Sequence, residues 1–183
     1  MVTIFLIHGA YGNPNENWFP WLSEKLQELG HKVIIPKFPT PENQKLENWL
    51  DVFNKYSKDV DKNTLFIGHS IGVAFILNLL EKYKIKAGLF VSGFCEKIDL
   101  QAFDEINETF LKDFDWNKIR LNCKKFVVYH SDNDPYVPLD YGKKLSKNLK
   151  VRLSLISGAG HFNEKSGYLH FPDILEQIKR LSK

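Results

Sequence analysis

One serine in this sequence has the neighbours that a nucleophile needs. Residues 68–72 read Gly-His-Ser-Ile-Gly, so Ser70 stands at the centre of a G-x-S-x-G pattern. The apolar run at 65–67 predicts a strand before it, and the run at 73–77 predicts a buried helix after it. A sharp turn between the two would strain the serine backbone and project its hydroxyl above the sheet. The pattern favours Ser70 as a nucleophile over a serine that only caps the helix.

A serine hydroxyl becomes a useful nucleophile only when a base takes its proton. His161 follows the last predicted strand, and the residues before it, 158–160, read Gly-Ala-Gly, which suits a loop that leans toward a site. His130 and His170 are the competitors, but one lies at a strand end and the other at the start of the last helix. We therefore expect His161 to be the base, and the alternative is an ordinary surface-loop histidine.

The base in turn needs an acidic partner that fixes its tautomer and stabilises the imidazolium. Two aspartates, Asp132 and Asp134, follow the fifth predicted strand. A proline follows Asp134, and an aspartate held in such a turn suits an orienting role, whereas Asp132 suits a turn in which its side chain bonds its own backbone. We favour Asp134, which gives the chain order Ser, Asp, His.

The same chemistry requires two N–H donors for the oxyanion of a tetrahedral intermediate. One expected donor is the backbone N–H of Ile71, directly after the nucleophile. The other is the N–H of Ala10, in the loop after the first strand, where the preceding His-Gly pair could also form only a tight turn. Near the predicted mouth stand Tyr11, Phe94 and Phe162, which line an acyl pocket or simply pack in the core; the sequence favours neither.

Strands that alternate with helices must bring these residues together. Six short apolar runs predict strands, and most are continuous, as in strands that are buried on both faces. Segments of helical period lie between them. This pattern predicts an α/β fold with a parallel sheet, helices on both faces, and ligands beyond the carboxyl ends of the strands. The predicted strands lie at residues 4–7, 33–35, 65–67, 89–91, 126–129 and 151–156.

The chain length fits a single domain over residues 1–183. The one long interruption of the alternating pattern covers residues 92–125, where Phe103, Ile106, Phe110 and Leu111 suggest a short helix and Trp116 a further contact. We expect this insertion to form a small cap.

Composition excludes several classes of function. The 25 Lys and Arg residues against 22 Asp and Glu give a charge of +3, too even for a nucleic-acid or membrane-surface footprint. No run is long enough for a membrane helix, and no leader is evident. Cys95 and Cys123 form neither a disulfide framework nor a zinc site, and no nucleotide-binding glycine motif follows a strand. We expect a cytoplasmic protein without metal or cofactor, of undetermined oligomeric state.

Taken together, the motifs resemble a known family, the small α/β-hydrolases of the YdeN type, which are relatives of the retinoblastoma-binding protein 9 serine hydrolases. The likeness covers almost the entire chain. It implies a minimal α/β-hydrolase fold with a six-stranded parallel sheet, and it maps the family triad onto Ser70, Asp134 and His161. The segments that carry it lie at residues 8–10, 17–22, 68–72, 92–94, 134–138 and 160–162.

The resemblance implies a serine hydrolase, carboxylesterase-like, that cleaves small acyl compounds such as esters. An amidase, an aminopeptidase or a thioesterase would use the same residues and remains an alternative. A non-catalytic protein-binding module on the same scaffold is the other alternative. A pocket-protein ligand would carry Leu-x-Cys-x-Glu, but residues 121–125 read Leu-Asn-Cys-Lys-Lys, with a lysine in place of the acid, which argues against that interaction.

Overall fold

A parallel sheet of six strands forms the centre of the protein. The computed structural model describes residues 1–183. The strands are adjacent in the order β2-β1-β3-β4-β5-β6, and every neighbouring pair is parallel. This arrangement confirms the fold class that the alternating pattern predicts. The strands are β1 (Thr3–Ile7), β2 (Lys32–Ile34), β3 (Leu65–His69), β4 (Ala87–Val91), β5 (Phe126–His130) and β6 (Leu153–Leu155).

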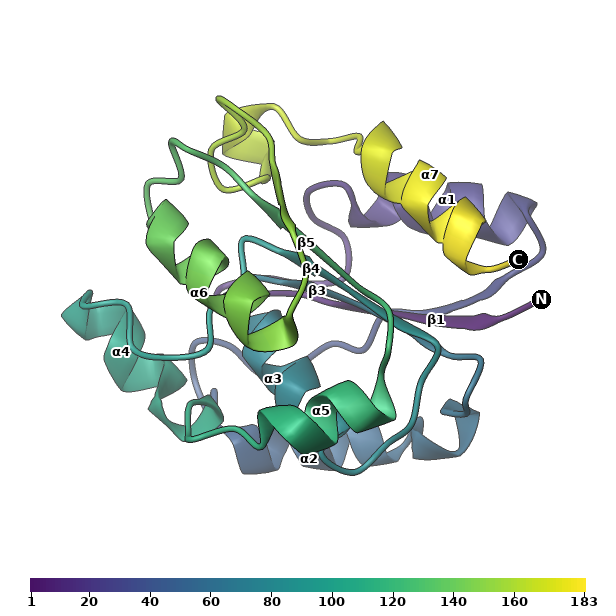
Figure 1. The fold of residues 1–183 in the computed structure, drawn as a ribbon, viewed down its shortest axis with the longest axis horizontal. Helices are drawn as coiled ribbons and strands as arrows, with labels where there is room; N and C mark the ends of the chain where they lie inside the picture. Colours follow the sequence, from purple (N-terminus) through teal and green to yellow (C-terminus); the bar gives the residue numbers. More distant parts are fainter.

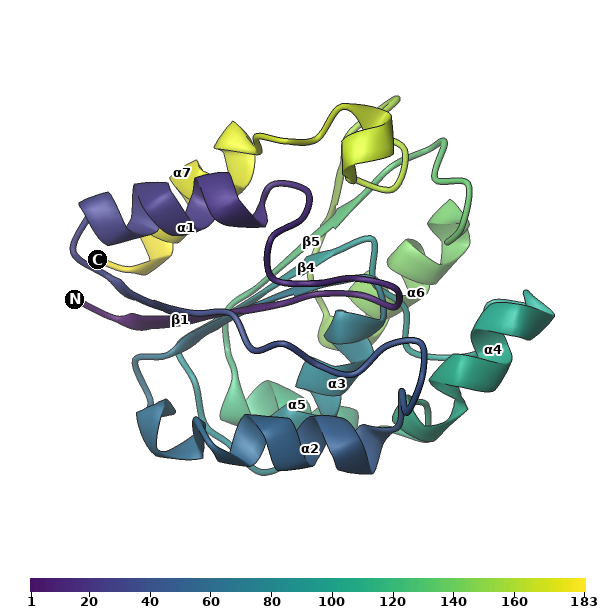
Figure 2. The same ribbon diagram turned by 180° about the vertical axis from the view of Figure 1, so that it is seen from behind.

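Helices cover both faces of the sheet (Figures 1 and 2). On one face lie α1 (Phe19–Glu28) and α7 (Pro172–Leu181), and α7 begins with the proline that its first turn tolerates. On the other face lie α2 (Leu46–Asn54), α3 (Ile71–Leu80), α5 (Trp116–Asn122) and α6 (Leu139–Leu149). Each face has its own cluster of buried apolar side chains, one of 27 residues and the other of 19. The strands are therefore buried on both sides, as their continuous apolar runs predict.

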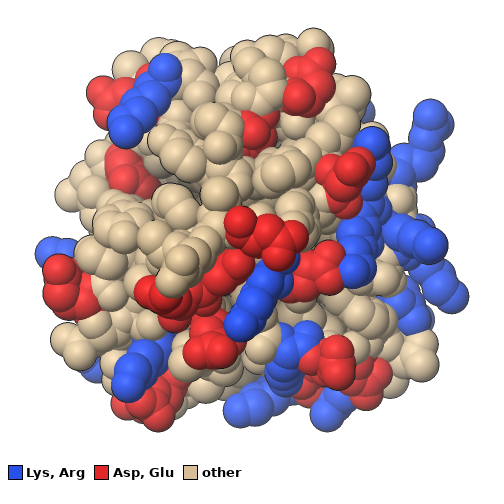
Figure 3. Space-filling model, turned by 90° about the vertical axis from the view of Figure 1, so that its left-hand side faces the viewer, with Lys and Arg blue, Asp and Glu red and all other residues tan.

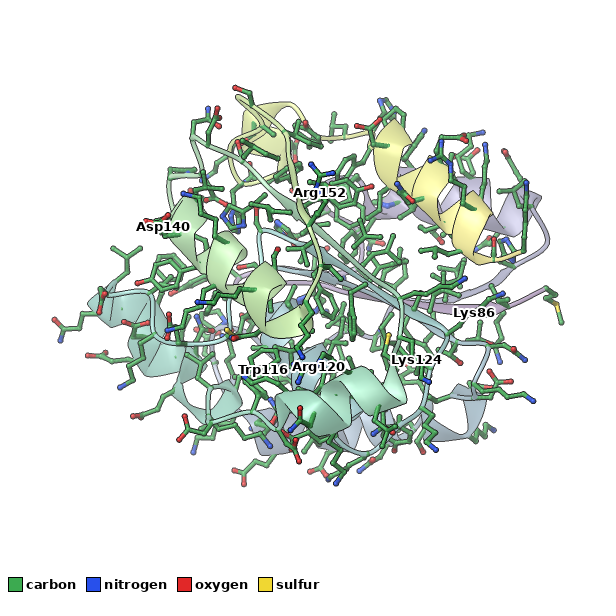
Figure 4. All side chains as sticks on the ribbon, in the orientation of Figure 1. Lys86, Trp116, Arg120, Lys124, Asp140 and Arg152 are labelled. Carbon is green, nitrogen blue, oxygen red and sulfur yellow. The ribbon has the colours of Figure 1, made fainter.

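The helix α6 shows how charge and burial are divided on the surface. Its Leu145 and Leu149 are buried, while Lys143 and Lys144 point outward and pair with Asp140 and Glu96. Asp140 stands at the amino-terminal end of the helix (Figure 4). With its leucines buried and its lysines outside, α6 is an amphipathic helix with a solvated face. On the face of the molecule that Figure 3 shows, basic side chains gather along one edge and acidic ones near the middle.

The insertion after β4 has two parts with different roles. The first part forms α4 (Gln101–Asn107) and a short turn of helix (Glu108–Phe110), and α4 projects from the body of the molecule (Figures 1 and 2). The second part, α5, belongs to the core, because Ile119 is fully buried and Arg120 donates to the carbonyl of Asn148 in α6. Arg120 and Trp116 lie along α5 in Figure 4. Only the first half of the insertion is available as a cap.

The carboxyl ends of the strands meet at one end of the molecule, opposite to both chain termini (Figures 1 and 2). The register pairs Ile7 at the end of β1 with Gly68 of β3, and His69 of β3 with Val91 of β4. The loops after β1 and β4 therefore flank the turn after β3. This is the end at which the sequence predicts the candidate residues to meet.

Candidate active site

Ser70 occupies the turn between β3 and α3 in a strained conformation, with φ 56° and ψ −127°. It holds the N-cap position of α3, but its side chain makes no capping hydrogen bond and instead lines a cavity. A Cβ atom on Gly72 would lie 2.6 Å from the carbonyl oxygens of Ile7 and His8, so only glycine lets α3 begin this close to β1. Ser70 is half-buried, and its strained backbone and uncapped side chain match the strand-turn-helix geometry of the G-x-S-x-G pattern better than that of a helix cap.

Two backbone amides lie beside this serine with no helix or strand partner. Ile71 is the first residue of α3, and the first intrahelical bond runs from the N–H of Val73 to the carbonyl of Ser70, at 3.0 Å. The N–H of Ala10 makes no hydrogen bond within the protein. A Cβ atom on Gly9 would lie 3.4 Å from the Ser70 Oγ, so the loop after β1 runs against the nucleophile. Both amides are thus available to an oxyanion.

His8, which is fully buried, holds the loop after β1 in place. Its Nε2 accepts the N–H of Phe38 at 3.1 Å, so the proton sits on Nδ1 and is donated to the carbonyl of Gly9 at 2.9 Å. Burial lowers the pKa of His8, which keeps the ring neutral and this tautomer in place. The loop with Ala10 is therefore fixed before any substrate arrives.

His161, which lines the cavity, is hydrogen-bonded to Asp134. The His161 Nδ1 lies 2.8 Å from Oδ2 and 3.0 Å from Oδ1 of Asp134, whose side chain is fully buried. Burial alone would raise the pKa of Asp134, but hydrogen bonds from His161 and from the N–H groups of Val137 and Tyr136 outweigh it and hold that pKa below its usual value. The carboxylate is ionised and orients the imidazole, as a triad aspartate does.

The alternative candidates for the acid and the base, Asp132, His130 and His170, lie outside the cavity. Asp132 accepts hydrogen bonds from the hydroxyl of Ser157 and the N–H of Gly158, so it ties two loops together. His130 is buried and donates to the carbonyl of Val137, while His170 is exposed at the surface beside Trp21. None of the three lines the cavity.

The cavity has a volume of about 420 Å³, and both apolar and polar side chains line it. The sequence offers no signal for the polar residues, because they come from loops that meet only in the folded chain. The apolar set comprises Tyr11, Phe94, Ile98, Phe103, Tyr136 and Val137, and the polar set Glu16, Asn17, Asn107, Asn163, Glu164 and Lys165.

The expectation for the three aromatic residues needs one correction. Tyr11 and Phe94 line the cavity, but Phe162 does not. Phe162 is fully buried in the core, where its ring stacks on Phe171 at 5.3 Å and meets Tyr168 at 4.9 Å. Its left-handed backbone, with φ 50°, turns the side chain toward α7 while the preceding His161 faces the cavity.

Glu16, which lines the cavity, has a strongly raised pKa. Burial is the main cause that raises its pKa to about 7, and the nearby carboxylate of Glu164 adds to the effect. Neither carboxylate forms an ion pair with a lysine or arginine. No cluster of three or more His, Cys, Asp or Glu side chains is placed to hold a metal ion.

The family model described as serine hydrolase matches residues 4–180 of the chain. The chain belongs to the serine hydrolase family. Among its curated relatives is YdeN of Bacillus subtilis (strain 168), 32% identical over 180 residues, which cover 96% of this chain and 93% of that protein. The serine hydrolase RBBP9 of Rattus norvegicus is 22% identical, with 90% of this chain and 86% of that protein covered. The family resemblance of the motifs is thereby confirmed.

Solved structures agree with this membership. The crystal structure of the B. subtilis ydeN gene product matches this serine hydrolase with a TM-score of 0.91 and 28% identity, covering 99% of this chain and 98% of that chain. Est1E of Butyrivibrio proteoclasticus, solved with ferulic acid bound, shares the fold with a TM-score of 0.66 and 22% identity, covering 98% and 90% of the two chains. None of the helices of this serine hydrolase is long and apolar enough to cross a membrane.

Proposed function

We propose that this serine hydrolase cleaves small carboxylic esters through a covalent acyl-enzyme. Ser70 attacks the acyl carbonyl, His161 takes the serine proton, and Asp134 stabilises the resulting imidazolium. The N–H groups of Ala10 and Ile71 hold the oxyanion. His161 then protonates the leaving alcohol, and water releases the acid by the same steps. The observation that carries this proposal is that His161, which is hydrogen-bonded to the buried Asp134, lines the same cavity as the strained Ser70.

The apolar side chains of the cavity support an acyl substrate of modest size. The volume of the whole cavity, about 420 Å³, lies within the usual range of small-molecule sites. Est1E, which shares the fold, was solved with ferulic acid, a small aromatic acid, in its structure. An ester suits the chemistry better than an amide, because resonance with nitrogen makes an amide carbonyl less electrophilic toward the serine hydroxyl than an ester carbonyl.

The test compares the wild type with two serine variants. A short-chain p-nitrophenyl ester and a fluorophosphonate probe should report on the same residue, so Ser70→Ala should lose both hydrolysis and labelling while its unfolding temperature stays near that of the wild type. Ser157→Ala removes an exposed serine that does not line the cavity and should retain both. Labelling at Ser131 or Ser157, or no labelling, would contradict the proposal.

Thioester and amide substrates of the same acyl group distinguish the related activities. Faster turnover of the thioester or the amide than of the ester would keep the Ser70 mechanism but change the substrate class. Binding of a protein partner without turnover of any of the three would point to a non-catalytic module.

A further inference from the structure

Two buried side-chain rings donate hydrogen bonds to the backbone at His161. The carbonyl of His161 lies 2.8 Å from Nε2 of His69, and the next carbonyl, that of Phe162, accepts the indole N–H of Trp18 at 3.0 Å. A carbonyl oxygen can only accept, so Nε2 of His69 carries its proton. Trp18 is fully buried and His69 is 4% exposed. Two consecutive peptide groups are therefore held by ring N–H donors shielded from water.

The backbone at this point requires such support. Phe162 has φ 50° and Gly160 has φ 55°, so the residues on both sides of His161 are left-handed. A non-glycine residue in this region costs free energy and persists only where its surroundings hold it. The two carbonyl contacts fix the orientation of the peptide groups after His161 and so the direction in which its side chain leaves the chain.

The donors come from elements that also build the rest of the site. His69 directly precedes Ser70, so its contact ties the backbone of the base to that of the nucleophile across 92 residues of sequence. Trp18 is the N-cap of α1, and its neighbour Asn17 accepts the N–H of Glu164 at 2.9 Å. The rings of Trp18 and His69 meet edge to face, with centroids 6.3 Å apart. The two hydrogen bonds thus connect the loop at His161 to the turn after β3 and to the start of α1.

His69 is suited to this role because it stays neutral. Burial, and then the neighbouring His161, lower the pKa of His69 to about 3. The two rings lie 4.7 Å apart, so a charged His69 would oppose the imidazolium that forms on His161 during the reaction. A neutral ring donates its hydrogen bond without that cost.

We propose that His69 and Trp18 act as a pair of positioning residues, which clamp the carbonyls of His161 and Phe162 and so aim the His161 imidazole at Ser70. This inference rests on the proposed serine hydrolase activity. Neither residue takes part in bond making. Loss of one donor lets the strained loop relax, and a shift of the base by about 1 Å can cost about 100-fold in rate.

The experiment compares variants that keep or remove the donor. His69→Gln retains an N–H group near the position of Nε2, whereas His69→Phe keeps a ring but has no donor. We expect His69→Phe to lower kcat by about 10- to 100-fold with little change in KM, and His69→Gln to keep most of the wild-type kcat. Trp18→Phe should also lower kcat, and it serves as the second test if His69→Phe does not fold.

Asn122→Leu is the control, because Asn122 is a buried residue outside the cavity whose amide N–H donates to a carbonyl, that of Leu80, at 2.8 Å. It should lower the unfolding temperature and leave kcat unchanged. If Trp18→Phe and His69→Phe behave like this control, with lower stability but normal kcat, the two residues are only structural and the proposal is wrong.

A signal that needs no substrate separates this inference from the proposed function. The proton between His161 Nδ1 and Asp134 should give a downfield proton NMR resonance in the wild type and in His69→Gln. Exchange should broaden or remove it in His69→Phe and Trp18→Phe, because the ring then leaves its position. This result would support the clamp even if no ester were hydrolysed. A resonance that stays sharp in both donor-free variants would overturn it.

Discussion

Asp134 and Asp132 are two residues apart in the sequence but have different hydrogen-bond partners in the fold. Only Asp134 touches His161, while Asp132 joins the loops after β5 and β6. Asp134→Asn should therefore lower kcat by about 10⁴-fold, because the amide favours the wrong tautomer of the base. Asp132→Asn should be mild. Kinetics of both variants on one ester, with unfolding temperatures as the control, test this ranking, and the reverse ranking would transfer the role to Asp132.

The raised pKa of Glu16 predicts a pH-dependent effect on stability. A carboxyl group ionises near pH 4.5 in the unfolded chain but near pH 7 here, so the folded state holds this proton more tightly. Ionisation of Glu16 therefore costs stability as the pH rises from about 4.5 to 7. Glu16→Gln removes that cost, and it should raise the unfolding temperature more at pH 8 than at pH 4.5.

Thermal unfolding followed by circular dichroism at the two pH values gives the measurement. Glu24→Gln supplies the control, because Glu24 is exposed on α1 and does not line the cavity. Equal shifts for Glu16→Gln at both pH values would mean that the carboxyl is not held in a desolvated site.

The sequence predicts single residues well where chemistry ties them to a strand end. Ser70 and His161 follow from motif and chain order, and the proline after Asp134 favours it over Asp132; in the folded chain only Asp134 contacts His161. Glu16 could not be found, because nothing in its neighbourhood in the sequence signals that it faces a cavity. The sequence leaves open whether Phe162 lines the pocket or packs in the core, because the direction of its side chain depends on a left-handed backbone that the sequence does not reveal.

At the scale of elements, α4 is the part that sets the size of the site. Its Phe103 contacts the rings of Tyr11 and Tyr136, with centroids 6.1 and 6.0 Å away, and lines the cavity together with them. A single short helix offers little further cover. The sequence predicts a helix here but not that the insertion divides, because the apolar residues of α5 look the same whether they pack on a cap or on the core.

We expect kcat/KM to peak for acyl chains of about two to six carbons and then to fall. Each further methylene that a site buries is worth about 0.8 kcal/mol, or about fourfold, and this gain ends where the cavity ends. Phe103→Ala should move the peak toward longer chains, whereas Leu100→Ala, at an exposed position directly before the same helix and outside the cavity, should not.

A series of p-nitrophenyl esters of increasing chain length measures this profile. A wild-type maximum at twelve carbons or more would show that α4 does not limit the site.

At the scale of the whole molecule, stability rests on an aromatic core whose rings do not line the cavity. Trp49 is fully buried, stacks on Phe38 at 4.4 Å and meets the edges of Phe75 and Phe110. Trp49→Ala should lower the free energy of unfolding by about 3 to 5 kcal/mol. The half-buried Trp21 on α1 is the control, and Trp21→Ala should cost clearly less. Denaturant unfolding measures both, and equal losses would contradict this view of the core.

The position of the chain ends bears on how the protein can be handled. Both termini lie together at the end of the sheet opposite to the carboxyl ends of the strands (Figures 1 and 2), and Ser70, which follows the carboxyl end of β3, lines the cavity. A bead, a surface or a fused fluorescent domain attached through either terminus would therefore leave the mouth of the cavity facing solution. The same catalyst can be immobilised by its first or its last residue, and substrate should reach it equally well in both orientations.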